Sequence, residues 1–216
     1  MSSIYIFIMN SFKIFQIEKG SEDIRRTILT NVVKMLIERK LLNNDKFEEH
    51  VSKLIEKKPD ESLYTINMDN YKDDADKKFI IKIFDQKIVS ISRQSPINEF
   101  LLKYKNIPKI IIVKEINTKS AQFITSAYPK TELFLEHELL INIIEADIVD
   151  RYEPLDRDSE QFKQFHQDYQ SKKRRDPFLF HTDAMAKYYN LKKGDIVRII
   201  RSSETSSESP FYRLVI

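Results

Sequence analysis

The residues with the clearest potential for chemistry are two acidic positions and a lysine in the first half of the chain. Pro59-Asp60 is followed, after a gap, by Asp85-Gln86-Lys87. Magnesium-dependent nucleases of the PD-(D/E)xK type use two carboxylates to hold the metal ion and a lysine near the attacking water. Such a nuclease is the alternative function. However, the pattern is short in a chain rich in Asp and Lys, so we expect alanine to replace Asp60, Asp85 and Lys87 without loss of function.

Other catalytic or ligand-binding patterns are missing from the sequence. The chain has no cysteine and only two glycines, Gly20 and Gly194. These counts exclude thiolate nucleophiles, cysteine-based zinc sites, P-loops and dinucleotide fingerprints. The four histidines are far apart and form no His-x-x-x-His pair. These patterns therefore give no sign of a cysteine-based, histidine-pair or glycine-loop site.

The charge of the chain is small overall and unevenly distributed. The net charge is +3, which predicts no strong general attraction to nucleic acid or membrane. Residues 171–216 hold ten Lys/Arg against five Asp/Glu, so the basic surplus lies in the C-terminal part. The basic run 172–175 could contact phosphates, but we interpret it as a solvated linker because no aromatic residues alternate with it. The apolar stretch 4–9 is too short to cross a bilayer and lacks a basic n-region, so we expect a protein that is not secreted.

Hydrophobic periodicity predicts an α/β domain over residues 1–144. Apolar residues at helical spacing predict two long helices at the start of this region, and short runs rich in Ile, Val and aromatic residues predict strands after them. The expected helices are 22–41, 46–57, 96–104 and 118–127, and the expected strands are 63–68, 79–84, 109–113 and 139–144. Helices mixed with short strands indicate α/β or α+β architecture.

The remaining residues predict a junction and a small α+β domain. The polar segment 147–158 contains Pro154 and is typical of a linker, and a helix is expected over 160–169. Residues 145–170 therefore form the expected junction and linker helix, and residues 171–216 the C-terminal domain. In that domain we expect a helix over 182–189 and two strands over 195–201 and 211–216. Gly194 lies between helix and strand, where a positive φ is cheap only for glycine.

The C-terminal domain resembles one known family. The motifs that carry this resemblance are Asp183–Tyr189, Leu191-Lys192-Lys193-Gly194, Val197-Arg198-Ile199-Ile200-Arg201, Ser203-Glu204-Thr205 and Tyr212-Arg213-Leu214-Val215. Together they are similar to the fifth subunit of eukaryotic-type DNA-dependent RNA polymerases, a family that includes an archaeal counterpart. The upstream part matches less closely: Glu145 and Ala146 stand where the family usually has histidines. These departures and the Ile/Lys-rich composition favour a divergent member, from a large DNA virus or an AT-rich protist.

The resemblance implies a noncatalytic subunit in transcription, for which we expect no catalytic residue, no metal, no cofactor and no small-molecule substrate. Its C-terminal domain would assemble on the largest polymerase subunit, and its N-terminal domain, similar in shape to restriction-type nucleases, would form a jaw near downstream DNA and contact it weakly. Its place would be the nucleus or, for a viral member, the virion and the cytoplasm of the infected cell. The adjacent Ile199 and Ile200 must point to opposite faces of a strand, so one can pack inside while the other faces a partner. The expected contacts with the largest subunit are Ile200, Arg201, Ser203, Glu204, Thr205 and Arg213.

Overall fold

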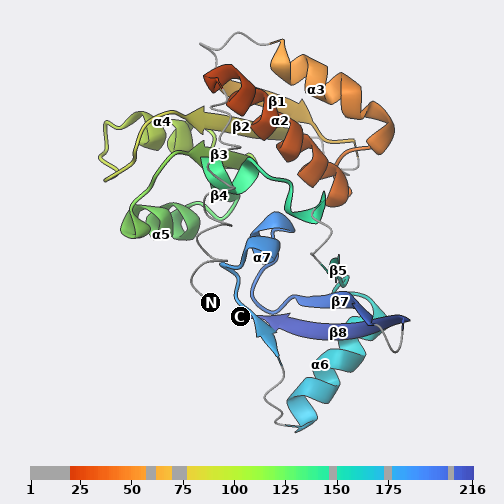
Figure 1. The fold of residues 1–216 in the computed structure, drawn as a ribbon. Coiled ribbons are helices and arrows are strands. Elements are labelled where there is room, and N and C mark those ends of the chain that lie inside the picture. The colour runs from red at the N-terminus through yellow and green to blue at the C-terminus, as the bar shows by residue number, and fades with distance from the viewer. Residues whose placement is uncertain (1–19, 57–61, 70–76, 146–149, 173–176, 204–206) are drawn as a thin grey trace, which may run out of the picture.

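The computed structural model describes residues 20–56, 62–69, 77–145, 150–172, 177–203 and 207–216. Within these ranges the chain forms two bodies, each built around its own sheet (Figure 1). None of the described helices is long and apolar enough to cross a membrane.

The N-terminal body contains a four-stranded mixed sheet with the order β1-β2-β3-β4. Strands β1 and β2 are antiparallel, while β2, β3 and β4 run parallel. Parallel neighbours require a crossover, and a helix supplies each one: α4 connects β2 to β3, and α5 connects β3 to β4. The bounds are β1 (Leu63–Asn67), β2 (Lys78–Phe84), α4 (Pro96–Lys103), β3 (Lys109–Val113), α5 (Thr118–Ala127) and β4 (Thr131–Leu135).

Helices cover both faces of this sheet, which makes a three-layer α/β/α domain (Figure 1). Helices α2 (Ser21–Glu38) and α3 (Phe47–Ile55) bury one core against Ile81, Ile110 and Ile112. Helices α4 and α5 bury a second core against residues of the same strands that point to the opposite face, as strand periodicity requires. All five residues of β3 are buried, which explains why its sequence is almost continuously apolar.

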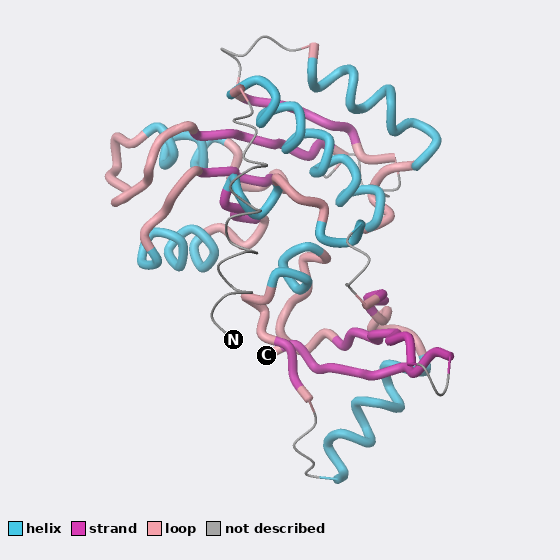
Figure 2. The backbone as a smooth tube through the Cα atoms, viewed as in Figure 1, coloured by secondary structure: helices cyan, strands magenta, loops and turns pink. Residues whose placement is uncertain are grey.

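The C-terminal body contains a second four-stranded sheet with the order β5-β7-β8-β6, seen as the lower group of strands in Figure 2. Helix α6 (Glu160–Lys172) packs on one face, where the ring of Phe165 stacks on Tyr212 with 5.5 Å between centroids. Helix α7 (Ala184–Tyr188) packs on the other face through Ala186. The strands are β5 (Arg151–Pro154), β6 (Phe178–Leu179), β7 (Ile196–Ser203) and β8 (Ser207–Val215).

Local sequence signals explain how α7 begins and ends. The Asp183 carboxylate accepts a hydrogen bond from the Met185 backbone N–H at 2.9 Å, as an N-cap does. The helix stops before Asn190, which has a left-handed φ of 52°. Gly194 has φ 89°, so the expected positive φ between helix and strand is confirmed. Helix α2 begins differently: its N-cap position is Gly20, which has no side chain to accept a capping hydrogen bond, and Ser21 is the first residue of the helix.

Two expectations from the sequence are wrong. Residues 139–144 do not form a strand: they lie in and between the short 3-10 helices Glu136–Leu139 and Ile143–Glu145, and the carbonyl of Leu139 accepts a hydrogen bond from Asn31 rather than from a neighbouring strand. The strand at this place in the sheet is β4, which the sequence analysis missed because Glu132 interrupts its apolar run. The segment 147–158 is not only a linker, because β5 lies within it and pairs with β7.

A lysine lies fully buried at the start of β3. The side chain of Lys109 has no exposed surface, and its ammonium donates to the carbonyls of Tyr104 at 2.8 Å and Ile107 at 3.1 Å. These carbonyls lie at and just beyond the C-terminal end of α4, where a cation is favourable. Burial, together with a smaller effect of the nearby Lys130 charge, lowers the pKa of Lys109 to about 8.

This pKa predicts a specific dependence of stability on pH. Between pH 8 and the ordinary lysine pKa of about 10.5, the unfolded chain keeps a proton that folded Lys109 has released, so stability rises with pH. Relative to Lys109→Met, the wild-type free energy of unfolding should rise by up to about 1.4 kcal/mol per pH unit in this window. Urea denaturation of both proteins at pH 7.5 to 10 measures the difference. If the free energy of unfolding of the two proteins changes with pH in the same way, the lowered pKa of Lys109 is contradicted.

A buried arginine joins the two bodies. The guanidinium of Arg39, just after α2, lies 2.8 Å from a carboxylate oxygen of Glu132 on β4, and the two side chains are 5% and 12% exposed. The same guanidinium donates to the carbonyls of Tyr188 at 2.5 Å and Lys187 at 2.9 Å, at the end of α7. One cation therefore binds a carboxylate of the first sheet and the negative end of a helix of the second body. We call this arrangement the Arg39 clamp.

Further contacts surround the Arg39 clamp. Tyr188 is buried in the N-terminal core beside α2 and α3, and its hydroxyl lies 3.3 Å from the side-chain oxygen of Asn142. Lys187 pairs with Glu138 at 2.6 Å and lies over the ring of Phe134 at 5.1 Å. The C-terminal body thus contributes side chains to the core of the N-terminal one.

Removing the cation alone should destabilise the protein strongly. Arg39→Met leaves Glu132 buried without its partner, and breaking a buried pair in this way costs about 3–5 kcal/mol. The double variant Arg39→Met/Glu132→Met removes the unpaired charge and should recover much of that loss. Urea denaturation of the three proteins gives the comparison. A change below about 0.5 kcal/mol in the single variant would show that the clamp does not hold the two bodies together.

Candidate functional site

The face of the C-terminal sheet that α6 does not cover carries a row of side chains from three strands. Tyr152 on β5 pairs with Ile199 on β7, and Ile199 pairs with Phe211 on β8. Residues directly opposite in adjacent strands point to the same face. Ile199 at the centre is buried in the core beneath α7, while Phe211 at the end of the row is 45% exposed.

Arg201 is held beside this exposed ring. Its guanidinium lies 5.1 Å from the centroid of the Phe211 ring, and its Nε donates to the Asp150 carboxylate at 2.9 Å. Arg201 has the same strand parity as Ile199, so it projects from the same face. The aromatic ring and the carboxylate fix the arginine in one orientation, although 45% of its side chain remains exposed.

Arg213 completes the surface. It lies two residues after Phe211 on the same face of β8 and is half-buried. Burial raises the pKa of the Tyr152 phenol and Asp183 adds to this, while the positive charge of Arg213 acts in the opposite direction. We call Tyr152, Arg201, Phe211 and Arg213 the aromatic–arginine patch. Its arginines and aromatic rings suit contact with protein, because these residue types are enriched where protein interfaces bury surface.

The expected site residues are only partly brought together. Arg201 and Arg213 share one face, but Ile200 points to the α6 face and is 7% exposed, so the expectation that one of the two isoleucines is left outside is wrong for this chain. The side chains of β7 alternate between the two faces as expected, but α6 packs on the face that carries Ile200. Ser203 ends β7, and its side chain, Glu204 and Thr205 lie outside the described residues. Sequence reasoning missed Tyr152 and Phe211, although the alternation Phe211, Arg213, Val215 was a usable signal.

The residues of the nuclease pattern do not assemble into a described site. Asp60 lies outside the described residues, and Asp85 is exposed just after β2. Lys87 is exposed and forms an ion pair with Glu115 rather than with Asp85. In the described part of the chain, no three His, Asp or Glu side chains are close enough to hold a metal ion. Of the basic run, residues 173–175 lie outside the described residues.

Comparison with known proteins points to one family throughout. Residues 141–215 match the family described as RNA polymerase Rpb5, C-terminal domain. The chain is 31% identical over 212 residues to DNA-directed RNA polymerase subunit 5 of Acanthamoeba polyphaga mimivirus, covering 94% of this chain and 97% of the relative. It is 34% identical over 165 residues to DNA-directed RNA polymerases I, II, and III subunit RPABC1 of Caenorhabditis elegans, covering 74% of this chain and 76% of the relative.

These relatives give the nuclease alternative no support, and their similarity is not confined to the C-terminal motifs. The alignment with the mimivirus protein covers 94% of this chain, so it spans residues of both the N-terminal body and the C-terminal sheet. The family expected from the C-terminal motifs is therefore confirmed: the chain belongs to the RNA polymerase subunit 5 (Rpb5) family.

Proposed function

We propose that this RNA polymerase subunit is noncatalytic and anchors on the largest polymerase subunit through the aromatic–arginine patch. The observation that carries the proposal is the exposed Phe211 ring with the Arg201 guanidinium stacked on it and held by Asp150. A solvent-facing aromatic ring in a small sheet contributes little to folding. Against a partner, by contrast, the same ring buries a large apolar surface.

The geometry of the patch suits tight binding. Arginine and aromatic residues dominate the binding energy of many interfaces, especially where neighbouring groups exclude water from them. Because Asp150 and Phe211 already fix the orientation of Arg201, less side-chain entropy is lost when a partner binds. Ser203, Glu204 and Thr205 stay expected contacts by sequence alone, since Glu204, Thr205 and the side chain of Ser203 lie outside the described residues.

The N-terminal body is the second part of the proposal: we infer that it lies near downstream DNA as a jaw. It has its own two cores, and the Arg39 clamp holds it to the anchored body. Residues 1–170 carry a slight negative charge, so the free protein should bind DNA weakly. In the polymerase, the high effective concentration of the duplex would allow even weak contacts to orient it.

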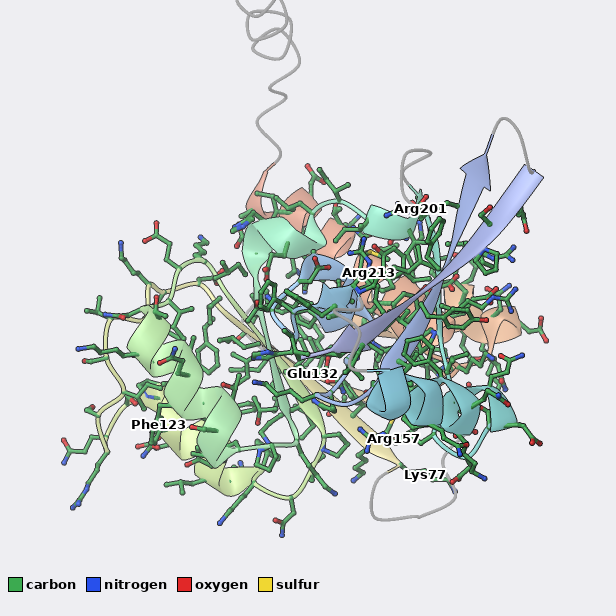
Figure 3. All side chains as sticks on the ribbon, turned by 90° about the horizontal axis from the view of Figure 1, so that it is seen from below. Lys77, Phe123, Glu132, Arg157, Arg201 and Arg213 are labelled. Carbon is green, nitrogen blue, oxygen red and sulfur yellow. The ribbon has the colours of Figure 1, made fainter. Side chains whose placement is uncertain are left out.

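Substitution of the patch tests the anchor. Arg201→Ala combined with Phe211→Ala should reduce co-purification with the largest subunit at least about tenfold, because two adjacent hot-spot side chains are lost. The matched control is Phe123→Ala on α5, which removes a ring of similar exposure, 48%, far from the patch (Figure 3). Both proteins should stay folded by circular dichroism. Normal co-purification of the patch variant would refute this anchoring surface.

Photo-cross-linking tests the jaw. Elongation complexes that contain the full-length subunit are assembled on DNA with a photoreactive thymidine analogue in the downstream duplex. Adducts on this subunit should map to residues 20–145 rather than to residues 177–216. Free protein should show no tight DNA binding at physiological salt. Adducts confined to other subunits, or tight binding by the free chain, would argue against a jaw role.

A further inference from the structure

The edge strand of the N-terminal sheet faces an open groove. Among the described strands, β4 pairs with β3 alone, so one side of its backbone is not used by the sheet. This side lies in the groove between α5 and the segment that contains α7. An unpaired strand edge presents N–H and carbonyl groups to which another extended chain can bind.

Three hydrogen bonds establish which backbone groups face the groove. The Lys109 N–H donates to the Lys130 carbonyl at 3.0 Å, so the even-numbered residues of this stretch point to β3. The Thr131 N–H, on the other side, donates to the Tyr128 carbonyl at 2.9 Å, and the Leu135 N–H donates to the Glu138 carboxylate at 2.8 Å. Leu133 lies between them on the outer side. Neither its N–H nor its carbonyl has a partner there among the described residues.

The walls of the groove leave space beside this edge. On one side, α5 presents small and polar side chains at helical spacing, including Ala121, Thr125 and Ser126. On the other side lie Ala186 and Leu191. Short side chains on a wall beside an edge strand allow a backbone to approach.

The charge of the groove is positive. Lys192 and Lys193 line it and are both exposed. Lys192 contacts the uncharged side chain of Asn190 at 2.6 Å, which leaves its charge available. The lining carboxylate Glu132 is already neutralised by Arg39. A binding partner with acidic side chains is therefore favoured by charge complementarity.

We propose that the outer edge of β4 binds an extended acidic polypeptide segment of another protein, which adds a strand to the sheet through the N–H and carbonyl of Leu133. Main-chain hydrogen bonds supply affinity, and the lysines supply preference for acidic side chains. This groove lies between β4 and α5 of the N-terminal body and the α7 segment of the C-terminal body, and it shares no residue with the aromatic–arginine patch. Its failure would therefore leave the anchoring proposal intact.

The test uses the isotope-labelled full-length chain and a defined probe, a nonapeptide that alternates valine and glutamate. Titration followed by NMR should give saturable shifts of the Leu133 amide and of the amides of Lys192 and Lys193. The matched probe alternates valine and lysine and should bind at least tenfold more weakly. Leu133→Pro removes the outward N–H without removing a bond to β3, since proline is tolerated in this way on edge strands. It should weaken binding of the acidic peptide at least tenfold, while Leu133→Val, which keeps the N–H, should bind normally.

A second variant keeps the proposal testable if Leu133→Pro does not fold. Lys192→Glu with Lys193→Glu changes two exposed side chains and should reverse the preference between the two peptides. Equal binding of both peptides by the wild-type chain, or no binding at millimolar concentration, would overturn the proposal. Protection of the Leu133 amide from hydrogen exchange before any peptide is added would also overturn the proposal, because it would show that this chain itself occupies the edge of β4. Tighter binding of duplex DNA at the same amides would identify a nucleic-acid site instead.

Discussion

The Arg39 clamp is the interaction on which the arrangement of the whole subunit depends. One buried guanidinium binds Glu132 of the first sheet and the last carbonyls of α7 in the second body. Neither group could be buried there without a cation, because an unpaired carboxylate and unsatisfied carbonyls are both costly. The clamp therefore turns two small bodies into one unit. If the subunit anchors through its C-terminal sheet as proposed, the clamp would place the N-terminal body at a defined position, which a flexible linker could not do.

The fold was predictable where the local pattern and the tertiary environment agree. Strand β3 and helix α5 were predicted at their observed bounds, since a short run rich in Ile and Val favours a buried strand and Pro129 follows the end of the helix. Prediction failed where tertiary contacts decide. The apolar run 139–144 forms 3-10 turns because Asn31 takes up the carbonyl of Leu139, and β4 tolerates Glu132 because Arg39 neutralises it. Strand β5 was hidden in a polar segment because β7, with which it pairs at the edge of the sheet, lies more than forty residues away.

In the candidate site too, the residues given by local motifs were predictable and those brought in by tertiary contacts were not. The family motifs identified Arg201 and Arg213, and strand parity places both on one face. Phe211 could have been found from its alternation with Arg213 on the same strand, whereas Tyr152 joins the patch only through the pairing of β5 with β7. The burial of Ile200 depends on the packing of α6, and no local pattern shows which face a distant helix will cover. Sequence motifs thus indicated the family, whereas the structure was needed to show which side chains lie beside Arg201 and Arg213.

The most direct test of this account is a cryo-electron microscopy reconstruction of the polymerase that contains this subunit. The account predicts that Arg201, Phe211 and Arg213 are buried against the largest subunit. It also predicts that the Arg39 clamp is intact and that the N-terminal body projects toward the downstream duplex. A map in which the aromatic–arginine patch faces solvent while the subunit is held by other surfaces would contradict it.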